Sequence, residues 1–88
     1  MKDGPALYMP DLAVEVQSPG QSDKLMSDKA TFYLQHGTHL VWLIYPEKRL
    51  VEVLTTDDRA LLTEDDRLTG TEILPDFTFT IRDLFTEL

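Results

Sequence analysis

The sequence predicts a small α/β fold with one mixed sheet, in which a strand, a helix and three further strands precede a C-terminal arm. Three observations support this expectation. Residues 11–17 alternate between apolar and polar side chains, which is the period of a strand. Residues 22–36 combine helix-forming side chains with a serine before them and a glycine after them. Residues 39–45 are almost all apolar, as in a strand that is buried on both faces.

The first strand has two distinct faces. Side chains alternate along a strand, so Leu12, Val14 and Val16 share one face and the polar residues share the other with Ala13. The Ser-Pro-Gly sequence at residues 18–20 then turns the chain.

The helix at residues 22–36 has recognisable ends. Ser22 is a favourable N-cap, because its hydroxyl can accept a backbone N–H of the first turn, and Asp23 suits the positive end of the helix dipole. Gly37 is well placed as the residue that ends the helix. Since a helix separates the first strand from the strand at residues 39–45, these two strands are expected to run parallel through a right-handed crossover.

The remaining strands of the sheet are expected to be antiparallel. A tight connection at residues 46–49 leads to an alternating strand at residues 50–56, which predicts a β-hairpin. Residues 59–63 predict a third antiparallel strand.

The C-terminal arm is less regular. Residues 68–85 begin with a turn and contain a short alternating strand around Phe77, Phe79 and Ile81. A helical turn near residues 83–85 is expected to close the chain.

Length and composition limit the possible functions. A chain of 88 residues forms a single small domain, in which residues 1–9 are expected to be an irregular lead-in. The absence of cysteine excludes disulfides, zinc–thiolate sites and a thiol nucleophile. A net charge of −8 opposes DNA binding, which depends on Lys and Arg at the phosphates. Much of the acid lies in residues 55–72, so a local basic patch elsewhere stays possible.

A cytoplasmic location is the expectation from the sequence. The apolar runs are shorter than the roughly 20 residues that cross a bilayer. The first residues also lack the apolar core of a signal peptide.

Glu15 is the most informative residue for function. It stands between two valines in a strand, where burial would cost free energy without a compensating partner. In one interpretation the polar face of this strand simply faces water. In the other, Glu15 faces the helix and meets a cation there.

Lys29 favours the second interpretation. Its neighbours at three and four positions along the helix are all apolar or aromatic: Leu25, Met26, Phe32 and Tyr33. Lys24 projects about 140° away from it at ~100° per residue. A lysine on the packed face either pairs with an acid or extends its ammonium group to solvent. Glu15 is the obvious acid, and a lysine that reaches solvent without a catalytic task is the alternative.

Gln17 and Asp11 are further candidates for the same site. Gln17 follows Glu15 by two residues, where nucleases carry a lysine after the metal-binding carboxylate, but an amide supplies no positive charge. Asp11 would be a second metal ligand, yet four strand residues span roughly 13 Å. Two carboxylates so far apart cannot share one Mg²⁺, whose oxygen ligands lie about 2.1 Å away, unless the strand bends or a second chain contributes.

Four blocks of the sequence resemble, in order, the C-terminal half of the Uma-two family of endonucleases: PDLAVEVQSPG, DKATFYLQHG, LVWLIYPEKRLVEVL and LTGTEILPDFTFTIRDLF. The resemblance covers about residues 10–85. It implies a restriction-endonuclease-like core of the PD-(D/E)XK class and hydrolysis of DNA phosphodiester bonds with Mg²⁺ or Mn²⁺. Glu15 matches the metal-binding glutamate of the family, and Lys29 matches a lysine that the family carries on the helix.

The chain also departs from the family pattern. Asp11 is similar to a second Pro-Asp that precedes the family's glutamate. The catalytic aspartate of the family lies on an upstream strand, in an earlier Pro-Asp, and members are about twice as long. The resemblance therefore implies a truncated nuclease core without that aspartate.

Two functions remain open from the sequence. The first is a Mg²⁺-dependent endonuclease with Glu15 and Lys29 as catalytic residues and Glu15 and Asp11 as metal ligands. The second is a non-catalytic remnant that acts as a dimerisation or protein-interaction module, because missing strands would leave a sheet edge and apolar faces for a second chain to cover.

Overall fold

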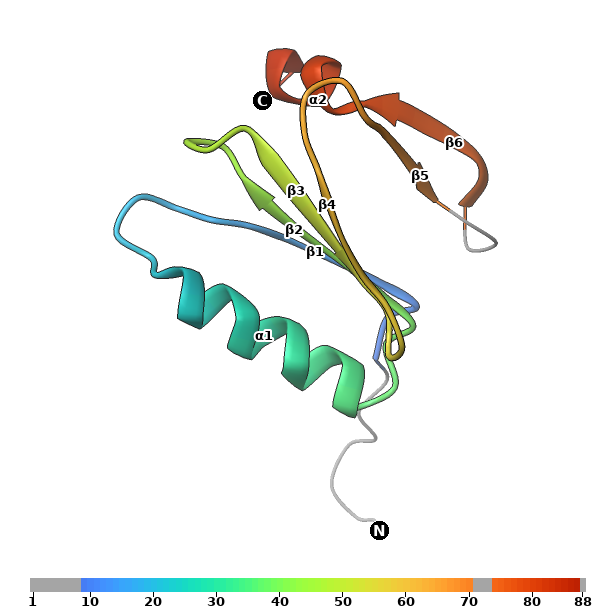
Figure 1. The fold of residues 1–88 in the computed structure, drawn as a ribbon. Helices are drawn as coiled ribbons and strands as arrows, with labels where there is room; N and C mark the ends of the chain where they lie inside the picture. Colours follow the sequence, from blue (N-terminus) through green and yellow to red (C-terminus); the bar gives the residue numbers. More distant parts are fainter. Residues whose placement is uncertain (1–8, 71–73, 88) are drawn as a thin grey trace, which may run out of the picture.

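The computed structural model describes residues 9–70 and 74–87 of the chain. Figure 1 shows a helix packed below a twisted sheet, and a two-stranded ribbon with a short helix on the other side. In chain order the elements are β1 (Leu12–Val16), α1 (Asp23–Gln35), β2 (Leu40–Tyr45), β3 (Leu50–Leu54), β4 (Arg59–Leu62), β5 (Arg67–Gly70), β6 (Leu74–Thr80) and α2 (Ile81–Glu87).

The main sheet confirms the predicted mixed topology. Its strand order is β1-β2-β3-β4, so β1 and β4 are the two edges. β1 runs parallel to β2, as expected of two strands joined by a helix, and Val14 lies opposite Trp42. The β2–β3 and β3–β4 pairs are antiparallel.

The sheet is buried on both faces along β2, because different elements cover its two sides. All six residues of β2 are buried. Val41, Leu43 and Tyr45 belong to the core beneath α1. Their neighbours Leu40, Trp42 and Ile44 belong to a second core that Leu68 of β5 and Ile81 of α2 complete. The continuous apolar run at residues 39–45 is therefore explained by cover on both sides.

The faces of β1 differ in an unexpected way. Ala13 is 6 % exposed and packs under α1, whereas Val14 and Val16 lie on the opposite face and are 45 % and 43 % exposed. Alternation then puts Glu15 on the same side as Ala13, toward the helix. The interpretation in which the polar face of this strand faces water is therefore wrong.

The C-terminal arm is more regular than the sequence indicated. The predicted turn after residue 67 is instead strand β5, which pairs antiparallel with β6 in a separate two-stranded sheet. Ile81, expected in a strand, begins α2 and is fully buried. Phe79 lies in β6, while the side chain of Phe77 is outside the described part of the chain. None of the described helices is long and apolar enough to cross a membrane.

The N-cap of α1 supports a test of local stability. Ser22 Oγ accepts the backbone N–H of Leu25 at 3.0 Å, as the sequence predicted. Ser22→Ala is expected to lower the free energy of unfolding by about 1 kcal/mol, because this N–H loses its partner. Ser27→Ala, inside the same helix, is the matched control and should be neutral or slightly stabilising, since alanine is the better helix former. Urea unfolding of both variants measures the difference, and equal losses would argue against the capping role.

Candidate active site

Glu15 is held between β1 and α1. Its strand is parallel to the buried β2, and its side chain lies on the face that α1 covers, with 21 % of the side chain exposed. A carboxylate that is partly buried needs donors to compensate for the hydration it has lost. The helix supplies them.

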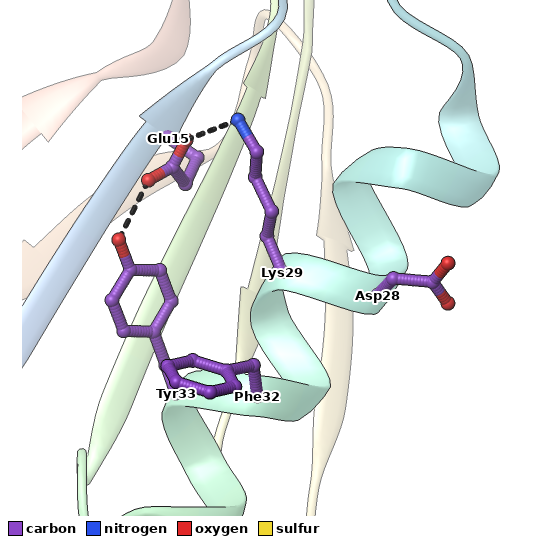
Figure 2. A pocket seen from close by; sticks show the side chains of 5 residues that line it. All are labelled: Glu15, Asp28, Lys29, Phe32 and Tyr33. Atoms are coloured by element: carbon purple, nitrogen blue, oxygen red, sulfur yellow. Dashed lines mark hydrogen bonds and ion pairs between the residues drawn. The ribbon is translucent and has the colours of Figure 1, made fainter.

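Two residues one helical turn apart bind the two carboxylate oxygens of Glu15. Lys29 Nζ lies 3.2 Å from Oε1, and the Tyr33 hydroxyl donates a hydrogen bond to Oε2 at 2.8 Å. Figure 2 shows both side chains reaching from α1 to the carboxylate. Positions four apart on a helix lie on the same face, so the spacing of Lys29 and Tyr33 lets both reach the same acid. The predicted partnership between Glu15 and Lys29 is confirmed.

These residues line a pocket of about 440 Å³ that Phe32 and Asp28 complete. Figure 2 shows the carboxylate of Asp28 pointing away from Glu15. Asp28 instead forms an ion pair with Lys24, one turn earlier on the helix, at 2.8 Å. The pocket therefore presents one carboxylate, one ammonium group and one hydroxyl that converge.

Gln17 does not join this group, although it is on the same face of the strand. Its amide Nε2 donates to the backbone oxygen of Gln21 at 2.9 Å and to Asp23 Oδ1 at 2.8 Å. Hydrogen bonds from Lys48 and from Gln17 lower the pKa of Asp23 below its usual value. Gln17 therefore stabilises the turn between β1 and α1 through these two hydrogen bonds.

Asp11 lies just before β1 and is exposed. Its backbone oxygen accepts the N–H groups of His39 and Leu40, at 3.2 and 3.1 Å, which ties the start of β1 to β2. It does not line the pocket of Glu15. Across residues 9–70 and 74–87, no group of three or more His, Cys, Asp or Glu side chains could hold a metal ion.

The sequence identified Tyr33 only as an aromatic neighbour of Lys29, and its hydrogen bond to Glu15 was not predicted. The signal was its position, four residues after Lys29 on the face that meets Glu15. The hydrogen bond to Glu15, together with burial and the negative charge of Glu15, raises the pKa of the Tyr33 hydroxyl above its ordinary value. The hydroxyl therefore remains a donor through the neutral range.

Titration of Tyr33 tests this contact. Because its folded-state pKa lies above the unfolded value of about 10, the stabilisation is fully present below that pH and is lost as pH rises through the folded-state pKa. Glu15→Gln removes the negative charge and should move the Tyr33 pKa down, toward its ordinary value. The measurement is a tyrosinate absorbance titration, with Tyr33→Phe identifying the signal. An unchanged midpoint in Glu15→Gln would contradict the contact.

Comparison with known proteins supports the fold and identifies the family. A solved structure described as a "putative nuclease belonging to DUF820", from Anabaena variabilis, is 28% identical to the chain, with a TM-score of 0.83. The match covers 91% of this chain and 46% of that one, so this chain spans about half the length of that protein. No curated protein matches the chain significantly. The sequence model of the Uma2 family, described as "Putative restriction endonuclease", matches residues 2–82, and the chain therefore belongs to the Uma2 family.

Proposed function

We propose that the protein hydrolyses DNA phosphodiester bonds with Mg²⁺ or Mn²⁺ at the pocket formed by Glu15, Lys29 and Tyr33. The observation that carries this proposal is a half-buried carboxylate with an ammonium group 3.2 Å from one oxygen, in an open pocket. Membership of a family described as endonucleases supports DNA as the substrate. The cytoplasm is the proposed location.

The donor set at the pocket fits Mg²⁺ in part. Mg²⁺ is usually held by one or two carboxylates, with water and substrate phosphates as its other ligands. Glu15 would be the carboxylate, since each of its oxygens accepts one hydrogen bond and keeps a further lone pair. Such an ion polarises the phosphate and lowers the pKa of a bound water. A second carboxylate would come from Asp11, through a bend of the strand, or from another polypeptide segment.

Lys29 and Tyr33 would position the reacting groups. The Tyr33 hydroxyl holds Oε2 at 2.8 Å and fixes the orientation of the Glu15 carboxylate. The Lys29 side chain is 36 % exposed, so its ammonium group can contact a phosphate oxygen that enters the pocket. A positive charge placed there in advance stabilises the charge that builds up during phosphodiester cleavage.

The charge of the chain does not exclude DNA at this pocket. Five acids, Asp57, Asp58, Glu64, Asp65 and Asp66, lie in the turns on either side of β4. β4 is the opposite edge of the sheet from β1, which carries Glu15. Within the pocket the charge of Glu15 is balanced by Lys29.

A second candidate function is a non-catalytic module for dimerisation or protein interaction. The observation in its favour is that Val14 and Val16, on the edge strand β1, are 45 % and 43 % exposed. An edge strand with unpaired backbone groups and exposed valines can accept a strand of another chain.

Plasmid cleavage separates the two functions. The purified chain is incubated with supercoiled DNA in Mg²⁺, in Mn²⁺ and in excess chelator. The nuclease proposal expects nicked or linear products with either metal and none with chelator. Absence of metal-dependent products over a range of protein concentrations would overturn the nuclease proposal and favour the non-catalytic module.

A further inference from the structure

Three polar side chains meet where α1 begins. Asp23, the first residue of the helix, accepts the amide N–H of Gln17 at 2.8 Å on one carboxylate oxygen. Its other oxygen forms an ion pair with Lys48, in the turn between β2 and β3. Lys48 also lies over the ring of the buried Tyr45, with Nζ 5.4 Å from the ring centroid. This N-terminal link, made of Gln17, Asp23 and Lys48, therefore joins the start of α1 to the end of β1 and to β2.

The N-terminal link connects the same two elements that form the candidate active site. Gln17 follows Glu15 by two residues, about 7 Å along a strand. Asp23 precedes Lys29 by six residues, about 9 Å along a helix. Within the described part of the chain, residues 11–17 reach α1 through three side-chain hydrogen bonds: the two that Glu15 accepts and the one that Gln17 donates to Asp23. The link is thus the polar contact between strand and helix that lies outside the site itself.

The apolar packing of α1 is too narrow to fix its position alone. Met26 and Ala30 are the buried side chains of this helix, and Ala30 offers a single methyl group. Tyr33 and Leu34 are partly buried against the same core. A helix that covers a sheet usually packs through three to four apolar residues in every two turns. Polar contacts at the end of α1 therefore help to set where along β1 the helix lies.

We propose that Asp23 is a positioning residue of the candidate active site, which acts through the N-terminal link. It holds α1 at the place along β1 where the two donors of the helix reach Glu15. The Asp23 side chain is 57 % exposed, and exposed ion pairs contribute little to folding. Removing it should therefore change the geometry at Glu15 more than the stability of the fold. The effect on geometry needs neither metal nor DNA, whereas an effect on cleavage rests on the proposed nuclease function.

The carbon-13 resonance of the ring carbon that bears the Tyr33 hydroxyl tests the positioning, because this carbon responds to the hydrogen bond with Glu15. Ring-labelled tyrosine at neutral pH gives the signal, Tyr33→Phe assigns it, and Glu15→Ala shows its position without the bond. The resonance is expected to move toward that position in Asp23→Ala. Gln17→Met removes the same link from the strand side and should move it in the same direction. The double variant should add little, because both changes remove one interaction.

Two controls separate positioning from a loss of charge or of helix stability. Asp28→Asn removes an acid of the same helix, beside the pocket of Glu15, and leaves the N-terminal link intact. Ser22→Ala weakens the start of the same helix, because the cap on Leu25 is lost. Both variants should keep the Tyr33 resonance at its wild-type position. An unchanged resonance in Asp23→Ala and Gln17→Met, or an equal movement in Ser22→Ala, would overturn the proposal.

Cleavage kinetics test the consequence for catalysis. Asp23→Ala is expected to lower kcat for plasmid DNA about 10-fold while KM stays near the wild-type value, since a misplacement of about 1 Å can reduce a rate on the order of 100-fold. A wild-type kcat in Asp23→Ala would overturn the role of the N-terminal link in catalysis. A moved Tyr33 resonance without metal-dependent cleavage by the wild-type chain would support the positioning and refute only the nuclease function.

Discussion

Replacing Glu15 with glutamine is expected to reduce metal-dependent DNA cleavage on the order of 100-fold or more, because a bound metal contributes several kcal/mol to charge stabilisation in the transition state. Glutamine keeps the shape of the side chain and an oxygen that can accept the hydrogen bond from Tyr33. It loses the negative charge that would hold the ion. Initial cleavage rates of supercoiled plasmid, compared at saturating Mg²⁺, measure the effect.

Two matched variants separate this effect from a general change of charge. Asp28→Asn removes an acid that lines the same pocket but points away from Glu15, and Lys24→Met removes the lysine that pairs with Asp28. Both should cleave at nearly the wild-type rate. Lys29→Met should lose activity, because the ammonium beside Glu15 disappears while the apolar part of the side chain remains.

Stability measurements distinguish a catalytic role of the Glu15–Lys29 pair from a structural one. The pair is partly exposed, with 21 % and 36 % of the two side chains accessible, so it contributes about 1 kcal/mol or less to folding. Lys29→Met should therefore remain folded while activity falls. Loss of activity that follows only from unfolding would contradict the catalytic assignment.

The largest loss of stability is expected for Leu43→Ala. Leu43 is fully buried at the centre of β2, in the core beneath α1. Removing its side chain leaves a cavity and should lower the free energy of unfolding by about 3 kcal/mol. Small domains have only about 5 kcal/mol in total, so much of the protein should unfold near physiological temperature. Thermal and urea unfolding followed by circular dichroism measure this.

Leu61→Ala is the control for the core substitution. Leu61 lies on β4 and is 58 % exposed, so the same change should alter stability by less than about 0.5 kcal/mol. Similar losses for Leu43→Ala and Leu61→Ala would mean that β2 is not the centre of the core.

The sequence alone was sufficient for β1, α1, β2 and the β2–β3 hairpin. The alternation in β1 and β3, the continuous apolar run of β2 and the caps of α1 at Ser22 and Gly37 are all local features of the sequence. The partnership of Glu15 with Lys29 followed from the same local rules, because the apolar neighbours of Lys29 place it on the face that packs against the sheet.

Other features depend on contacts between distant segments. Alternation divides β1 into two faces but does not decide which one the helix covers. The small side chain of Ala13 lies under α1, in the same core as Met26 and Ala30, while Val14 and Val16 remain half exposed. Strand β5 is defined by its pairing with β6 and carries little periodic signal of its own.

The different hydrogen-bond partners of Glu15 and Gln17 also depend on tertiary contacts. Both lie on the face of the strand toward the helix, so the sequence suggested one site for the two. The turn after β1 brings Gln21 and Asp23 within reach of the Gln17 amide, which bonds to them instead. Sequence spacing identifies which residues lie on the same face of a strand. The path of the chain after the strand decides which groups each of these residues contacts.

Titration of Mn²⁺ into the wild-type chain, Glu15→Gln and Asp28→Asn by calorimetry tests the central claim most directly, because it needs no DNA and no turnover. If Glu15 is the metal ligand, Mn²⁺ binds to the wild-type chain and to Asp28→Asn, and binding is lost in Glu15→Gln. Equal binding by all three proteins, or loss of binding only in Asp28→Asn, would contradict the assignment of Glu15 as the metal ligand of this pocket.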